Sequence, residues 1–375
     1  MEVVPEPFVF LIEHMQSWLD FLQQHGALVT DAATGAIGGF AGADGTAPPV
    51  TDFVVPLTDF GLIAATGADA ATFLHNQLTN NVEHLKVDQV RLAGYCTPKG
   101  RLLATFLLWK SGDTIYLQLP RELQAAVQKR LQMFIMRSKA SLTDVGAQQV
   151  QLGLVGASAA ALLSTWFPTL PAAPYAKVDS AAGSLLRLAD APLEHDAAGA
   201  TGTARYLWIT DEATAQAAWP TLSSALQPAG VSAWRLGEVR AAIPTITLPT
   251  QEKFVPQMIN FEAVGGVNFQ KGCYPGQEIV ARSQYLGKLK RRMLPATVAA
   301  AAVIAGTEVF AENDPEQACG MVVNAAPMAA GSACLIEIKL AATASVVHLG
   351  AIDGPVLQFH SLPYALADAD RPDLR

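Results

Sequence analysis

Apolar and polar positions alternate along this chain with two different periods, which predicts a mixture of helices and strands. Apolar residues at helical spacing predict an amphipathic helix over residues 14–24. Residues 31–51, rich in Gly, Ala, Thr and Asp, predict a poorly ordered connection. A first group of elements is then expected as a strand at 54–63, a helix at 70–77, strands at 89–96, 102–109 and 114–119, and a helix at 121–133.

A second group of elements has a similar composition. The Ala/Pro-rich stretch at 157–174 predicts a variable region, and Pro220 predicts a kink or restart inside its helix. Strands are expected at 150–155, 187–189 and 206–210, and helices at 211–226 and 233–241. Each group suits an open-faced α+β sheet of ferredoxin-like character.

Beyond Pro295 the pattern changes to short apolar runs separated by turn residues. Strands near 321–325, 334–340 and 356–359 fit a small antiparallel barrel. The sequence therefore predicts an α+β fold with two ferredoxin-like units and a small C-terminal antiparallel β-barrel. The expected parts are an N-terminal helix and linker (1–52), a first α+β domain (53–150), a second α+β domain (151–293), and the barrel with its tail (294–375).

Composition narrows the classes of function. A chain of 375 residues is too long to fold around one ordinary hydrophobic core. Of its residues, 51% are hydrophobic and 15% are charged. No run of eighteen apolar residues occurs and the acidic N-terminus lacks a secretory pattern, so a cytoplasmic protein without a membrane partner is expected. A net charge of −8 opposes direct binding to nucleic acid. The four cysteines form no CxxC pair, so neither a metal site nor a disulfide framework is expected.

Residues 271–278 concentrate nucleophilic, charged and turn-forming side chains. Gly272, Pro275 and Gly276 predict a bend, and Lys271 lies two residues from Cys273, which favours the reactive thiolate. The alternative is that Cys273 only packs, as most single cysteines do. Five basic residues follow between 282 and 292, in an acid-free stretch. They would hold a polyanionic ligand tail, or else form an ordinary solvated strand or loop.

The octapeptide K-G-C-Y-P-G-Q-E at 271–278 resembles the K-G-C-Y-x-G-Q-E signature of the YgfZ family. These folate-binding proteins are related to the glycine-cleavage T-protein and are associated with iron-sulfur cluster proteins and tRNA modification. Residues 73–82 also resemble this superfamily, with Asn81 where an acid is frequent. Residues 240–244 resemble its R-x-x-G-I-P pattern, with Ala242 in place of the glycine.

The resemblance implies a GcvT-like fold and a tetrahydrofolate derivative in a central cavity between the two α+β units. It implies a role in supporting iron-sulfur enzymes, including those that thiolate tRNA. Cys273 would be the reactive thiol and Lys271 its positive neighbour. The alternative is a folate-dependent aminomethyltransferase, which Asn81 disfavours because an amide is no general base. The expected cofactor-binding residues are Gln77, Asn81, Arg240, Gly272, Tyr274, Gly276, Gln277, Glu278 and Arg282.

Overall fold

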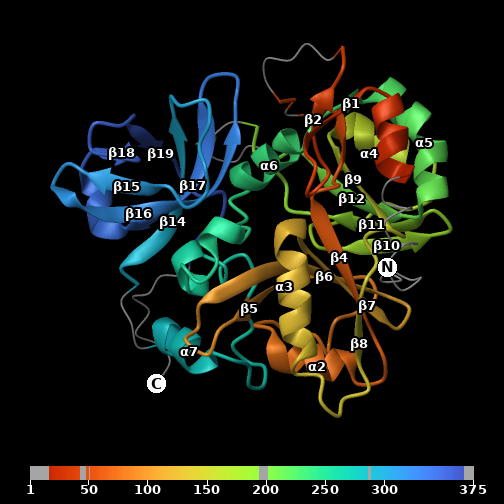
Figure 1. Cartoon of the computed structure of the whole chain (residues 1–375), viewed down its shortest axis with the longest axis horizontal. Helices are drawn as coiled ribbons and strands as arrows, with labels where there is room; N and C mark the ends of the chain where they lie inside the picture. Colours follow the sequence, from red (N-terminus) through yellow and green to blue (C-terminus); the bar gives the residue numbers. More distant parts are fainter. Residues whose placement is uncertain (1–16, 43–47, 50, 194–201, 286–288, 367–375) are drawn as a thin grey trace, which may run out of the picture.

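The computed structural model describes residues 17–42, 48–49, 51–193, 202–285 and 289–366. Within these ranges the chain forms two α+β units, an N-terminal hairpin and a C-terminal barrel-like sheet (Figure 1). Among these residues no helix combines the length and the apolar character that crossing a membrane requires.

The first unit is a five-stranded antiparallel sheet with two helices; both helices and three of the strands lie where the sequence predicted them, whereas the strand at residues 141–144 was not predicted. Leu123, Val127 and Leu131 are buried at four-residue spacing, so one face of the helix that they share packs on the sheet. The strand order is β5 (Val90–Cys96), β6 (Leu102–Ser111), β7 (Thr114–Pro120), β4 (Phe60–Thr66) and β8 (Ser141–Asp144), and the helices are α2 (Ala70–Gln77) and α3 (Arg121–Gln132).

The second unit is a six-stranded sheet that is apolar on both faces. Phe53 and Val55 join the large core shared with the first unit, whereas Val54, which lies between them in the same strand, joins a second core on the opposite face. The strand order is β10 (Lys177–Ser180), β11 (Gly183–Arg187), β12 (Arg205–Thr210), β9 (Val150–Val155), β3 (Phe53–Pro56) and β13 (Gln227–Pro228), with helices α4 (Ala157–Leu163) and α5 (Glu212–Ala225).

The predicted strand over 54–63 is divided between the two sheets. β3 pairs with β9 and, in parallel, with β13, while β4 enters the first sheet. A turn that includes Asp59 separates them, as predicted, but two strands replace one. The strand expected at 187–189 lies earlier, at β11. α5 runs through Pro220 without restarting.

The connection predicted to be poorly ordered contains a strand. β2 (Ala36–Phe40) pairs with β1 (Ala27–Asp31), and Ile37 and Phe40 are buried in the second core with Trp18 from the helical residues 17–24. The prediction was wrong for residues 36–40 because these apolar residues reach a core. Its residues 43–47 and 50 lie outside the described residues, as do 14–16 of the predicted helix. The variable region at 157–174 contains α4.

The C-terminal part is an antiparallel sheet that curls almost closed. A bridge between His348 and Val356 brings its two edges together. The predicted barrel is therefore confirmed, although β14, β15 and β18 were not expected from the sequence. The strand order is β18 (Val347–Leu349), β15 (Glu308–Ala311), β16 (Asp314–Pro327), β17 (Ser332–Lys339), β14 (Arg291–Val298) and β19 (Leu357–Phe359).

Helix α6 (Val231–Arg240) lies where these parts meet (Figure 1). It contacts β2, β3, β16 and β17, so residues of the hairpin, the second sheet and the barrel all surround it. Trp234, Leu236 and Val239 are buried. The helix predicted at 233–241 is thus present, and it lies where the hairpin, the second sheet and the barrel meet.

Candidate functional site

The loop at residues 271–278 is anchored on the C-terminal end of α2. The buried Lys271 Nζ donates to the carbonyl oxygens of His75 (2.5 Å) and Leu78 (2.9 Å) and lies 4.7 Å from the ring centroid of Tyr274. Carbonyls at a helix C-terminus lack helical partners and carry partial negative charge, so an ammonium group caps them well. Burial lowers the pKa of Lys271 to about 8. Lys271 therefore fixes the loop in place.

Cys273 is exposed, whereas the other three cysteines of the chain are buried. Burial raises the pKa of both Cys96 and Cys334 to about 12, which keeps these thiols protonated near neutral pH. Burial has the largest effect on the pKa of Lys271 and lowers it, whereas the nearby Cys273 has a smaller effect and raises it. The thiol thus lies within electrostatic reach of the ammonium group, as the sequence predicted, and it faces solvent.

Gly276 supplies the bend that the sequence predicts. Its φ is +82°, and a Cβ there would lie 2.4 Å from the carbonyl oxygen of Thr97 and 2.7 Å from the nitrogen of Gly100. The loop backbone is therefore packed directly on the turn between β5 and β6. Helix α7 (Gln277–Tyr285), which was not predicted, begins immediately afterwards. It places Gln277 half-buried and leaves Glu278 and Arg282 exposed.

Three further predicted residues lie in α2, in the connection that follows it and in α6. Gln77 ends α2 and is half-buried, and Asn81 follows in the connection to β5. The Asn81 Oδ1 accepts from the backbone N–H of His84 (3.1 Å), so its side chain caps a turn. Arg240 is in the last turn of α6. The structure thus brings Gln77 to the same end of α2 as Lys271, while Arg240 belongs to the helix at the centre.

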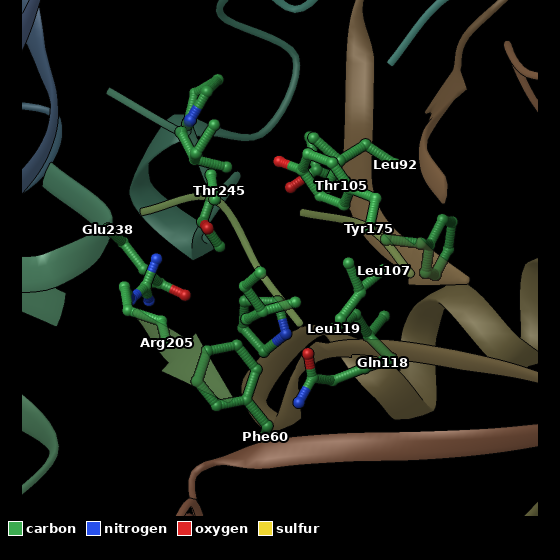
Figure 2. A pocket seen from close by; sticks show the side chains of 16 residues that line it. Phe60, Leu92, Thr105, Leu107, Gln118, Leu119, Tyr175, Arg205, Glu238 and Thr245 are labelled. Carbon is green, nitrogen blue, oxygen red and sulfur yellow. The ribbon is translucent and has the colours of Figure 1, made fainter. Parts of the chain in front are cut away.

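A cavity between the two sheets is lined by none of the predicted site residues. Figure 2 shows it, with apolar walls that include Phe60, Leu107 and Leu119, and with Arg205 and Glu238 facing one another. It lies between the two α+β units, where the resemblance placed a pterin. Sequence reasoning did not select its polar residues, because Arg205 begins a strand and resembles an exposed flanking charge.

Arg205 is 2% exposed, and its guanidinium stacks on the ring of Trp234 at 4.4 Å from the ring centroid. Its Nε and Nη2 are buried and have no hydrogen-bond partner among the described atoms. Burial lowers the pKa of Arg205, which nevertheless stays protonated in proteins. A Cβ on Gly237 would lie 3.0 Å from Nε, so this glycine makes room for the guanidinium beside α6.

Glu238 is the acid opposite Arg205. One oxygen accepts from Trp234 Nε1 (3.1 Å), and burial raises the pKa of Glu238 to about 6 although Arg205 opposes the shift. Burial likewise raises the pKa of Tyr175 to about 12, so this phenol remains neutral. A carboxylate and a guanidinium with free N–H groups can bind a flat ring that has donors and an acceptor along one edge.

The cavity has a volume of about 50 Å³, enough for a few water molecules. It adjoins a larger cleft of about 440 Å³, and Phe60, Pro120, Glu238 and Thr245 line both. The two spaces together reach the size of ordinary ligand sites. Among the residues that the structure describes, no three His, Cys, Asp or Glu side chains are grouped so as to hold a metal ion.

Comparisons with known proteins agree with this architecture. The GCVT N-terminal domain family matches residues 53–237. The tRNA-modifying protein YgfZ of Edwardsiella ictaluri (strain 93-146) is 33% identical over 253 residues, which are 66% of this chain and 72% of that protein. Its namesake from Escherichia coli O17:K52:H18 (strain UMN026 / ExPEC) is 31% identical over 240 residues, 64% of this chain and 70% of that protein.

A solved structure extends the likeness over nearly the whole fold. The glycine cleavage system aminomethyltransferase T from Bartonella henselae matches with a TM-score of 0.73, covering 92% of this chain and 96% of that chain at 17% identity. At this identity the likeness shows the fold, and it confirms the predicted GcvT-like class. Together with the two relatives, these findings confirm the resemblance first detected at residues 271–278: the chain belongs to the YgfZ family.

Proposed function

We propose that this chain is a cytoplasmic folate-binding accessory protein that supports iron-sulfur cluster assembly or repair and iron-sulfur-dependent tRNA modification. The observation that carries the folate part is the buried Arg205, which lies opposite Glu238 in an apolar cavity and whose Nε and Nη2 have no hydrogen-bond partner within the part of the chain that the structure describes. A buried charged donor without a partner costs free energy, which a bound acceptor would recover. The relatives' name, tRNA-modifying protein YgfZ, supports the link to tRNA modification.

The residues present fit a pterin. Its amino group and neighbouring ring N–H are donors that suit the Glu238 carboxylate, and its oxo group is an acceptor that suits Arg205. Phe60, Leu107 and Leu119 would contact the apolar faces of the ring. When bound, tetrahydrofolate supplies one-carbon or reducing chemistry, and this chain's residues orient it and exclude water.

Lys271 and Cys273 would act together at a separate surface. Neither lines the central cavity, and the Cys273 thiol is exposed on a loop that Lys271 holds to α2. We therefore assign the thiol to contact with iron-sulfur client proteins, without direct contact with nucleic acid. The folate-binding roles of the other residues predicted from the sequence stay predictions.

Calorimetry with tetrahydrofolate tests the cofactor assignment. Wild type should bind saturably and Arg205→Met should not, while Arg137→Met is the matched control in which an exposed cation outside the predicted site is removed. Among the described residues, Nε and Nη2 of Arg205 have no hydrogen-bond partner, so the substitution breaks no hydrogen bond at these atoms, and the melting curve of the variant checks that it is folded. Absence of saturable heat with the wild type would overturn the folate proposal.

Cys273→Ser tests the thiol. Since the side chain is exposed, the variant should fold normally yet fail to restore iron-sulfur enzyme activity in cells that lack the protein. Full restoration would show that the thiol has no essential role.

The second candidate is a folate-dependent aminomethyltransferase, which the fold shared with aminomethyltransferase T favours. Asn81 counts against it, because its amide caps a turn and cannot accept a proton near neutral pH. Incubation with an aminomethylated lipoyl carrier and tetrahydrofolate decides between the two. Ammonia release with formation of methylene-folate would establish transfer.

A further inference from the structure

The charged side chains that line the larger cleft beside the central cavity are mostly acidic. It lies between the β1–β2 hairpin, α6 and the C-terminal sheet, and Figure 1 shows these three parts meeting around α6. Its charged lining residues are the acids Asp31, Asp59, Glu122 and Glu238 and the single cation Arg235. An anionic ligand, such as the glutamate tail of a folate, would meet a negative surface there.

Asp59 carries the unusual feature of this cleft. Its side chain is 4% exposed, and Oδ2 pairs with Arg235, whose own side chain is 50% exposed. Oδ1 is buried and has no hydrogen-bond partner among the described atoms. A buried carboxylate oxygen without a donor is unfavourable, because its hydration is lost and nothing replaces it. Asp59 lines the cleft, so a donor bound there would supply the hydrogen bond that Oδ1 lacks.

The surrounding charges leave this acceptor available. Arg121, which interacts electrostatically with Asp59, donates to the carbonyl oxygens of Thr58 (3.0 Å) and Phe60 (3.1 Å) and is also balanced by Asp144. The Glu238 carboxylate lies within electrostatic reach of Asp59 and adds negative charge from the α6 side.

The two acids at the rim are already engaged. Glu122 Oε1 accepts from the backbone N–H of Leu248 (2.8 Å). Asp31 accepts from the backbone N–H of Ala33 and the hydroxyl of Thr34, both at 2.9 Å. They contribute negative potential at the mouth and leave Asp59 as the acceptor that needs a donor.

The walls between these charges are apolar and include Val231, Val239, Pro249, Val303 and Ile304. We propose that the cleft binds a molecule carrying a primary ammonium group on an apolar stem, with the ammonium group donating to Asp59 Oδ1 and its charge facing Glu238. The cleft volume of about 440 Å³ suits such a ligand. The proposal goes beyond the folate site, with which the cleft shares Glu238, and it does not depend on folate being bound.

Three probes of one shape test the proposal on the full chain: n-hexylamine, 1-hexanol and hexanoate, titrated at pH 7.5 by saturation-transfer NMR. The amine should bind saturably and about tenfold more tightly than the alcohol, because a charge-assisted hydrogen bond replaces a neutral one. Hexanoate should bind most weakly. Equal affinity for amine and alcohol would overturn the proposal.

Three variants locate the binding. Asp59→Asn should lower the affinity for hexylamine about tenfold and leave the affinity for hexanol unchanged. The matched rim control, Asp31→Asn, should keep the affinity for hexylamine within about twofold of the wild-type value. Unchanged hexylamine affinity in Asp59→Asn would refute the assigned partner. If that variant does not fold, Ala325→Phe fills the cleft from the C-terminal sheet and should abolish binding of both probes. Retained binding in it would also refute the site. Loss of amine binding with intact folate binding separates this proposal from the previous one.

Discussion

Replacing Gly276 by alanine tests how the cysteine loop is built. Gly276 and Gly265 have almost the same backbone conformation, with φ of +82° and +80°. A side chain costs roughly 1–2 kcal/mol in this left-handed region, so both alanine variants share that penalty. What distinguishes them is the space around the added Cβ.

The added Cβ at Gly276 meets backbone that cannot rotate away. It would lie 2.4 Å from the Thr97 oxygen and 2.7 Å from the Gly100 nitrogen, whereas nothing lies within 4 Å of a Cβ at Gly265. Overpacking of this kind costs about 1–3 kcal/mol more. We expect Gly276→Ala to lower the free energy of unfolding by about 2–5 kcal/mol and Gly265→Ala by about 1–2 kcal/mol.

Urea denaturation of both variants measures this difference in stability. The rate at which a thiol reagent modifies Cys273 measures whether the loop has changed its position. Gly276→Ala should change that rate because the loop must move away from the β5–β6 turn, and Gly265→Ala should leave it unchanged. Equal losses of stability in the two variants, with equal thiol rates, would refute the packing of the loop on the turn.

Three further predictions concern Lys271 and the central cavity. Lys271→Met leaves two carbonyl oxygens at the end of α2 without their donor, so the free energy of unfolding in urea should fall by about 2–4 kcal/mol; an unchanged value would mean that the lysine does not anchor the loop. Burial raises the pKa of Glu238 from 4.5 to about 6, so its contribution is present below pH 4.5 and lost as pH rises through 6. Relative to Glu238→Gln, wild type should therefore lose up to about 2 kcal/mol of stability between pH 4 and 7.5 in urea titrations, and a parallel pH profile would contradict this. Gly237→Ala should displace the Arg205 guanidinium and weaken tetrahydrofolate binding in calorimetry without lowering the melting temperature, since alanine favours helix; unaltered affinity would show that the guanidinium position is unimportant.

The local elements of this fold follow from the sequence. α3 is amphipathic because Leu123, Val127 and Leu131 recur every four residues, and that spacing is a property of the chain alone. The strands β5 and β6 and the turn between them follow equally from short-range pattern. The octapeptide at 271–278 identified the family, because the identity and order of its residues are also local.

Only the tertiary structure decided which elements meet. The sequence of β3 and β4 does not reveal that the first enters the second sheet, because strand pairing depends on partners about a hundred residues away, such as β9. The hairpin at β2 looked like a loop from its glycines, and only burial of Ile37 against a distant core makes it a strand.

The same division holds for the candidate site. The sequence shows that Lys271 is close to Cys273. Only the packing of the loop against α2 buries the lysine and lets it donate hydrogen bonds to two carbonyl oxygens, which anchor the loop. Arg205 and Glu238 are more than thirty residues apart and show no common motif, yet they face one cavity because β12 and α6 pack together. A motif is determined by neighbours in sequence, whereas a cavity and the desolvation of its charges arise only when distant segments exclude water together.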